Sequence, residues 1–126
     1  MNWLINRPDL SDADTYSFRI WLRRFWEIVI YSTKIKKVSA AYNAEKEDGI
    51  ILVDTSGGAV TVTLPAVTGT NQKTYVIKKS TNSANNITVA TPGSETIDGS
   101  ATSTVSGTSY ESKKYISDGA NWWTIT

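Results

Sequence analysis

Four acidic residues stand closest to the turn signals of the C-terminal part of the chain, namely Asp54, Glu95, Asp98 and Asp118. Carboxylates on such loops can bind calcium together with backbone carbonyls, and a pair of them can hydrolyse a glycosidic bond. The chain has no Asp-x-Asp-x-Asp-Gly loop, and the spacing of these acids supports no glycosidase pair. We therefore predict that these carboxylates cap turns.

The chain of 126 residues contains no histidine and no cysteine. It therefore lacks the commonest general base, the usual zinc ligands and any thiol for a disulfide. Its net charge of +1 gives no strong field that would attract nucleic acid or an acidic membrane. We predict a protein that is not an enzyme and that has no catalytic, cofactor-binding or metal-ligating residues.

Two adjacent tryptophans, Trp122 and Trp123, lie near the C-terminus. Neighbouring side chains of a strand point to opposite faces, so one indole should enter the core and the other should point outward. An outward tryptophan can stack on a sugar ring or contact another subunit. We predict a subunit contact, and a glycan site is the alternative.

The chain also contains two lysine doublets, Lys78-Lys79 and Lys113-Lys114, and the same alternation decides which face of the sheet each lysine occupies. Each doublet in a strand places one ammonium group on each face, and an unpartnered buried charge is costly. We expect edge strands, where lysine discourages aggregation, or ammonium groups that reach the rim. A site for a phosphate or a polyanion is the alternative.

The N-terminal part combines arginines with large aromatic side chains, as in Arg23, Arg24, Phe25 and Trp26. Such a mixture can bind nucleic acid or lie on a membrane surface. A helical period, however, gathers the aromatic rings into an apolar seam, where they are not free to stack on bases. We predict a protein-docking surface made of Phe18, Trp21, Leu22, Phe25, Trp26, Ile28 and Val29. Because the aromatic rings are in this seam, we predict no nucleic-acid partner. No run of about 20 apolar residues is present, so we also predict no membrane span.

The elements that carry these residues fall into two parts. Ser11 can cap a helix over about 12–36, with Asp12 and Asp14 in its first turn. The β-branched and aromatic residues at 28–31 leave an extended conformation open for the end of this segment. We expect a helical anchor at 1–37, a linker at 38–48 and a β domain at 49–126.

The β domain shows short alternating apolar runs separated by turn signals such as Asp118-Gly119. The predicted strands cover 50–54, 60–64, 74–79, 87–90, 102–105, 110–117 and 121–126, with a further short piece around 96–97. Strands of this length and spacing are typical of a small antiparallel sandwich or barrel. The predicted fold is therefore mainly β: a small antiparallel β-sandwich or barrel preceded by an N-terminal helix.

Four motifs in this region occur in a distinctive order. They are Val60-Thr61-Val62-Thr63-Leu64-Pro65, Tyr75-Val76-Ile77-Lys78-Lys79, Gly93-Ser94-Glu95-Thr96-Ile97-Asp98-Gly99 and Ser117-Asp118-Gly119-Ala120-Asn121-Trp122. Together they resemble a β domain that recurs in tail-fibre, head-fibre and decoration proteins of tailed bacteriophages. The resemblance covers about residues 49–126. It implies a structural role in the virion and, as is usual for such domains, a homotrimer.

These features lead to one hypothesis with one alternative. The protein is expected to be a structural component of the virion surface, a short fibre or a capsid-decoration protein. Its N-terminal segment would dock to other virion proteins of the capsid or tail, and its β domain would trimerise. The short chain favours the head of the particle over a long-shafted tail fibre. The alternative is a tail-fibre module that binds a receptor or a host-surface glycan.

Overall fold

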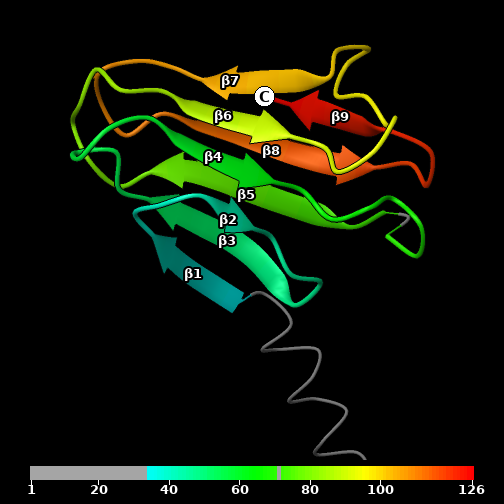
Figure 1. Ribbon diagram of the computed structural model, residues 1–126. Helices are drawn as coiled ribbons and strands as arrows, with labels where there is room; N and C mark the ends of the chain where they lie inside the picture. The colour runs from blue at the N-terminus through cyan, green and yellow to red at the C-terminus, as the bar shows by residue number, and fades with distance from the viewer. Residues whose placement is uncertain (1–33, 71) are drawn as a thin grey trace, which may run out of the picture. The chain divides into compact units, whose positions relative to one another are not determined.

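The computed structural model describes residues 34–70 and 72–126 (Figure 1). The chain divides into two units, Met1–Ser32 and Thr33–Thr126, and all the described residues belong to the second. The predicted helical anchor up to Thr33 and its seven docking residues, from Phe18 to Val29, therefore lie outside the described residues. No helix within the described part of the chain is long and apolar enough to cross a membrane.

The described residues are mainly β and form two sheets (Figure 1). The five-stranded sheet has the order β1-β3-β5-β8-β9, and the four-stranded sheet has the order β2-β4-β6-β7. The strands are β1 (Lys34–Val38), β2 (Tyr42–Asn43), β3 (Asp48–Val53), β4 (Val60–Thr63), β5 (Thr74–Lys79), β6 (Ile87–Ala90), β7 (Thr102–Val105), β8 (Ser112–Ser117) and β9 (Trp122–Ile125).

The chain passes alternately from one sheet to the other through its first six strands. As a result β1, β3 and β5 are parallel neighbours in one sheet, and β2, β4 and β6 are parallel neighbours in the other. The strands β2 to β5 each serve as the crossover between two parallel strands of the opposite sheet, so no helix is needed for this purpose. Only β7, β8 and β9 add antiparallel pairings.

This topology corrects the prediction of an antiparallel fold. Among the described strands four pairings are parallel and three are antiparallel. The alternation of apolar residues predicts where a strand lies and which face it buries, but it carries no information about the partner or its direction. The prediction was therefore correct for the mainly β class and wrong for these four pairings.

The predicted end of the helix and the predicted linker are also corrected. Residues 34–36 belong to β1, in which Ile35 is paired with Ile50 and Val38 with Val53. The predicted linker contains β2 and the start of β3. Pairing with β3 outweighs the favourable helix propensity of the lysines, because tertiary contacts routinely override propensity.

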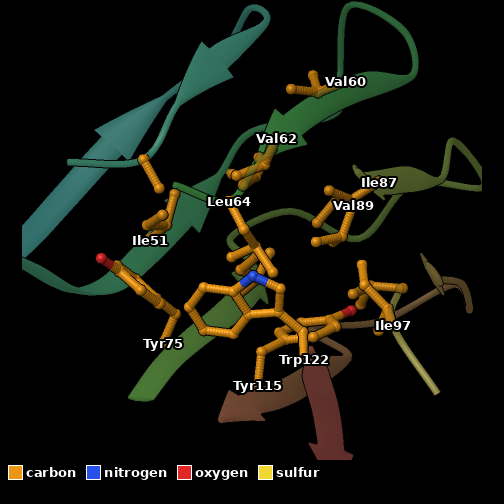
Figure 2. Packing of buried hydrophobic residues seen from close by; sticks show 14 of the residues in the cluster. Ile51, Val60, Val62, Leu64, Tyr75, Ile87, Val89, Ile97, Tyr115 and Trp122 are labelled. Atoms are coloured by element: carbon orange, nitrogen blue, oxygen red, sulfur yellow. The ribbon is translucent and has the colours of Figure 1, made fainter. Parts of the chain in front are cut away.

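The core lies between the two sheets and contains Trp122, Tyr75 and Tyr115 as its largest apolar side chains. Figure 2 shows the indole of Trp122 in the middle of this cluster. Its ring packs edge to face against that of Tyr75, with 5.6 Å between the ring centroids and 61° between the ring planes. The smaller members are Ala44, Ile51, Val53, Val60, Val62, Leu64, Val67, Ile77, Ile87, Val89, Ile97 and Val105. Burial of each large apolar side chain contributes about 1.5–3 kcal/mol, so this layer holds the sheets face to face.

Both lysine doublets lie on interior strands, which corrects the expectation of edge strands. β5 and β8 are each paired on both sides within the five-stranded sheet. The expected alternation is nevertheless present, because Lys79 is fully buried while Lys78 is only half-buried. The buried ammonium group does not reach the rim but donates hydrogen bonds to the backbone carbonyls of Ser83, Asn85 and Gly107.

Candidate functional site: the outer face of the five-stranded sheet

The two adjacent tryptophans of β9 occupy opposite faces, as predicted. Trp122 is completely buried in the core, whereas 46% of the surface of Trp123 is exposed. The indole of Trp123 is also held in place, because its Nε1 donates a hydrogen bond to Oδ2 of Asp118 at 2.7 Å. The exposed ring is thus a fixed apolar surface that spends little conformational entropy when a partner covers it.

Asp118 connects this ring to the turn between β8 and β9. Its Oδ1 accepts hydrogen bonds from the backbone nitrogens of Ala120 at 2.8 Å and Asn121 at 2.7 Å. The bond from Asn121, followed by those from Trp123 and Ala120, holds the pKa of the Asp118 carboxyl below its usual value. The carboxylate therefore caps the turn and positions the indole at the same time.

Strand register places further apolar side chains beside Trp123 on the side of the sheet that faces away from the core. We call this side the outer face. One row across it follows the paired residues Ile35, Ile50, Val76, Lys114 and Ile125. The next row contains Thr74, Ile116 and Trp123. Since Ile51, Ile77 and Tyr115 point into the core, the residues of these rows point outward.

Most of the exposed large apolar side chains gather on the outer face. Four large hydrophobic side chains are exposed among the described residues, and three of them lie here: Ile35 at 58%, Trp123 at 46% and Ile125 at 46%. The outward positions of the four-stranded sheet are more polar, because they carry the threonines Thr61, Thr63, Thr88, Thr102 and Thr104. Grouped exposed apolar side chains mark interaction sites, which makes the outer face the candidate site.

A groove lies on the same sheet at the carboxyl ends of the parallel strands β1, β3 and β5. It has a volume of about 390 Å³ and is lined by Lys37, Val38, Ser39, Leu52, Asp54 and Ser80. Lys37 and Leu52 are paired across β1 and β3. The side chain of Ser56 and then its backbone nitrogen, which donates a hydrogen bond to Oδ1 of Asp54, lower the pKa of the Asp54 carboxyl. The groove therefore combines an apolar wall with one ionised acid and one lysine.

The other two predicted turn acids do not cap their own turns, because each accepts its hydrogen bonds from a residue far away in the chain. Oδ1 and Oδ2 of Asp98 accept hydrogen bonds from the backbone nitrogen and hydroxyl of Thr124, which lower the pKa of the Asp98 carboxyl. Asp98 and Gly99 both have positive φ, at 51° and 82°, as a tight hairpin turn requires. Glu95 accepts a longer bond of 3.4 Å from the backbone nitrogen of Val67. Among the described residues no group of three or more acids is placed to hold a metal ion.

The sequence predicted that one of the pair Trp122 and Trp123 would be a contact residue, without choosing between them, and it predicted neither the neighbours of Trp123 nor the groove. Ile116 and Ile125 alternate with buried residues, so their outward direction was readable from the sequence. Ile125 lies on the same face as Trp123 because it is two residues further along β9, whereas the position of Ile116 beside Trp123 depends on the pairing of β8 with β9. The positions of Ile35 and Ile50 depend on parallel pairing. The groove brings together the ends of three strands and has no local signature in the sequence.

No model of a known protein family matches the chain, and no curated protein matches it either. What the outer face does must therefore follow from its own chemistry. That chemistry consists of a fixed indole, two rows of largely apolar side chains and a groove that carries both signs of charge.

Proposed function

We propose that this protein is a structural component of a tailed-phage virion, a short fibre or capsid-decoration protein that assembles as a homotrimer on the particle surface. The observation that supports this role best is the apolar outer face, which offers a partner a rigid sheet surface. The virion context comes from the four sequence motifs and their resemblance to a β domain of phage surface proteins. These motifs fall on β4, on β5, on the bridge between Ile97 and Ser100, and on the turn before β9.

The size of the outer face suggests how strongly it can hold a partner. Five strands at about 4.8 Å spacing make a surface roughly 19 Å wide. Ile35, Trp123 and Ile125 are each about half covered already, so complete burial would add roughly 1 kcal/mol for each. A total of about 3 kcal/mol is small beside the cost of association, which is roughly 4–15 kcal/mol. The assembly therefore needs further contacts.

We propose that the N-terminal segment supplies those contacts. Its docking residues, Phe18, Trp21, Leu22, Phe25, Trp26, Ile28 and Val29, would bind another virion protein of the capsid or tail. Three such segments carried by one trimer would act together, because linked binding sites raise each other's effective concentration. The weak subunit contact and the segment would thus reinforce one another.

A truncation tests the docking role of the segment. A chain that begins at Thr33 keeps β1 to β9, whereas removal of residues 1–37 would delete most of β1. We expect the full chain to be incorporated into particles and the truncated chain to fold without being incorporated. The full chain with Trp21→Ser and Phe25→Ser should also stay out of particles. Full-length Tyr110→Ser, which changes an exposed aromatic residue of the β domain, is the control and should be incorporated normally. Incorporation of the truncated chain would refute the docking role.

A receptor- or glycan-binding module is the second candidate, and the fixed indole of Trp123 favours it. Carbohydrate rings stack on aromatic faces whose orientation is set in advance. On this view the β domain binds a host-surface glycan, and Trp123→Ala abolishes adsorption of purified protein to host cells while Tyr110→Ala does not. If the structural role is the correct one, the purified protein does not adsorb to host cells at all, with or without either substitution, because another virion protein recognises the host.

A further inference from the structure

We infer that the subunits contact each other by placing the Trp123 corner of one copy into the groove beside Leu52 of the next. The Trp123 corner consists of Trp123 and Ile125 of β9 with the flanking charges Lys114 and Asp118. The inference rests on the proposed homotrimer and specifies which surfaces form its interface.

The corner and the groove lie at opposite ends of the same outer face. Trp123 is paired with Ile116, which is paired with Thr74, the first residue of β5. The groove includes Ser80, the residue after the last one of β5. Six residues of strand separate these two positions, a distance of roughly 20 Å, and the groove lies toward the other edge of the sheet. A chain therefore cannot fill its own groove with its own corner, but a second copy can.

Shape and charge make the two surfaces complementary. The groove of about 390 Å³ has Leu52 in its wall and carries Lys37 and Asp54. The corner presents an exposed indole whose Nε1 is bound to the carboxylate of Asp118, and Lys114 is paired with Ile125 in the adjacent row. Entry of the indole beside Leu52 can bring Asp118 toward Lys37 and Lys114 toward Asp54. Such pairing of opposite charges sets the orientation of an interface.

A backbone interface between sheet edges is the rival arrangement, and the edges oppose it. The free edge of β9 is already occupied, since the backbone nitrogens of Trp122 and Thr124 donate to Thr96 O and Asp98 Oδ1. The other edge of the five-stranded sheet is β1, in which three of the five residues are lysines. Lysine on an edge strand discourages strand addition. The contact therefore depends on side chains of the outer face.

The symmetry of the contact agrees with a trimer. The corner and the groove are different surfaces, so each copy offers one to the copy before it and the other to the copy after it. A contact between two different patches is heterologous and gives a ring when the rotation closes. A closed ring of three copies would use all three corners and all three grooves.

Cross-linking of the full-length protein tests the contact directly, because the natural chain has no cysteine. We would prepare Ile125→Cys and Ser80→Cys as separate variants, mix them under conditions that exchange subunits, and add a short bis-maleimide. The mixture should give cross-linked pairs of chains, while Ile125→Cys alone should give none. The matched control mixes Ile125→Cys with Thr104→Cys, which lies on the outward side of the four-stranded sheet and should not cross-link. Equal cross-linking with Thr104→Cys, or none with Ser80→Cys, would overturn the inference.

A second measurement uses the affinity of the subunits for each other. Trp123→Ala should raise the dissociation constant, measured by sedimentation, by about 5-fold or more, since complete burial of the half-covered indole contributes roughly 1 kcal/mol and 1.4 kcal/mol is a factor of ten. Ser80→Trp, which fills the groove and leaves the corner intact, should have the same effect, and Tyr110→Ala should have none.

The two readouts separate the failure of this contact from failure of the proposed function. If the natural chain is a monomer at every concentration, the homotrimer and the contact are both wrong. If it is a trimer that forms no cross-link and resists Trp123→Ala and Ser80→Trp, the contact alone is wrong.

Discussion

The ammonium group of Lys79 donates a hydrogen bond to the backbone carbonyl of Gly107 at 2.7 Å. The same nitrogen donates to the carbonyls of Ser83 and Asn85. One buried side chain at the end of β5 thereby connects the loop before β6 with the loop after β7. Buried backbone carbonyls need partners, and a charged donor supplies strong ones.

Replacement of Lys79 by methionine should destabilise the domain. The substitution keeps the length of the side chain but leaves three carbonyls without their donor, and each stranded acceptor costs about 1 kcal/mol or more. Relief from burying a charge offsets part of this loss, so we expect a decrease of about 2–4 kcal/mol in the free energy of unfolding. Lys78→Met is the matched control and should change it by less than about 1 kcal/mol, as is usual for surface substitutions. Urea unfolding measures both, and equal effects would refute the role of Lys79.

The two tryptophans should separate stability from assembly. Trp122→Ala removes the centre of the core and should lower the free energy of unfolding by about 3–5 kcal/mol. The Nε1 of Trp122 has no hydrogen-bond partner in the described part of the chain, so this loss measures packing alone. Trp123→Ala should cost about 1 kcal/mol or less when unfolding is followed at a protein concentration that keeps the chains apart. A large loss for Trp123→Ala in dissociated chains would place that ring in the core instead.

Tyr42 and Asp48 form a partly buried polar contact whose disruption should be measurable. The Tyr42 hydroxyl donates to Oδ2 of Asp48 at 2.7 Å, and Asp48 is fully buried with no hydrogen-bond partner for its Oδ1 among the described residues. Tyr42→Phe should lower the free energy of unfolding by about 1.5–3 kcal/mol, because the bond involves a buried charged group.

Tyr75→Phe is the comparison for that variant. Its hydroxyl donates to the neutral carbonyl of Glu45 at 2.9 Å, so its removal should cost about 1 kcal/mol. Thermal unfolding of the two variants in parallel tests whether Tyr42→Phe loses more stability than Tyr75→Phe. A larger loss for Tyr75→Phe than for Tyr42→Phe would contradict the importance of the carboxylate.

Stability should fall in acid partly through Asp118. Its folded pKa lies below the usual 3.8, so the unfolded chain takes up the proton first as the pH falls. The contribution of Asp118 is therefore complete above about pH 4–5 and is lost as the pH falls from there through the lowered folded pKa. Asp118→Asn keeps the turn but removes the titration, and we expect its melting temperature to decline less steeply below pH 4. Trp123→Phe removes only the indole donor and should give an intermediate slope. An unchanged slope in Asp118→Asn would show that other acids govern the acid transition.

Sequence alone determined the features of this protein that depend on neighbouring residues. Alternation placed β5, β6 and β7 at 74–79, 87–90 and 102–105, and the structure has the same bounds. Alternation also placed Trp122 and Trp123 on opposite faces of β9, because successive side chains of a strand must face opposite ways. The turn acids Asp54 and Asp118 were readable for a similar reason, since each accepts a hydrogen bond from a backbone nitrogen two or three residues further along the chain.

Tertiary structure decided everything that needs residues far apart in the chain. The path of the chain from one sheet to the other decides three such features. They are the parallel pairing of β1 with β3, the hydrogen-bond partners of Lys79, and the groove that contains Leu52 and Ser80. A strand carries its face in its sequence but not its partner, because the backbone groups that pair it are the same in every residue. The apolar outer face, on which the proposed assembly depends, exists only once those partners have been chosen.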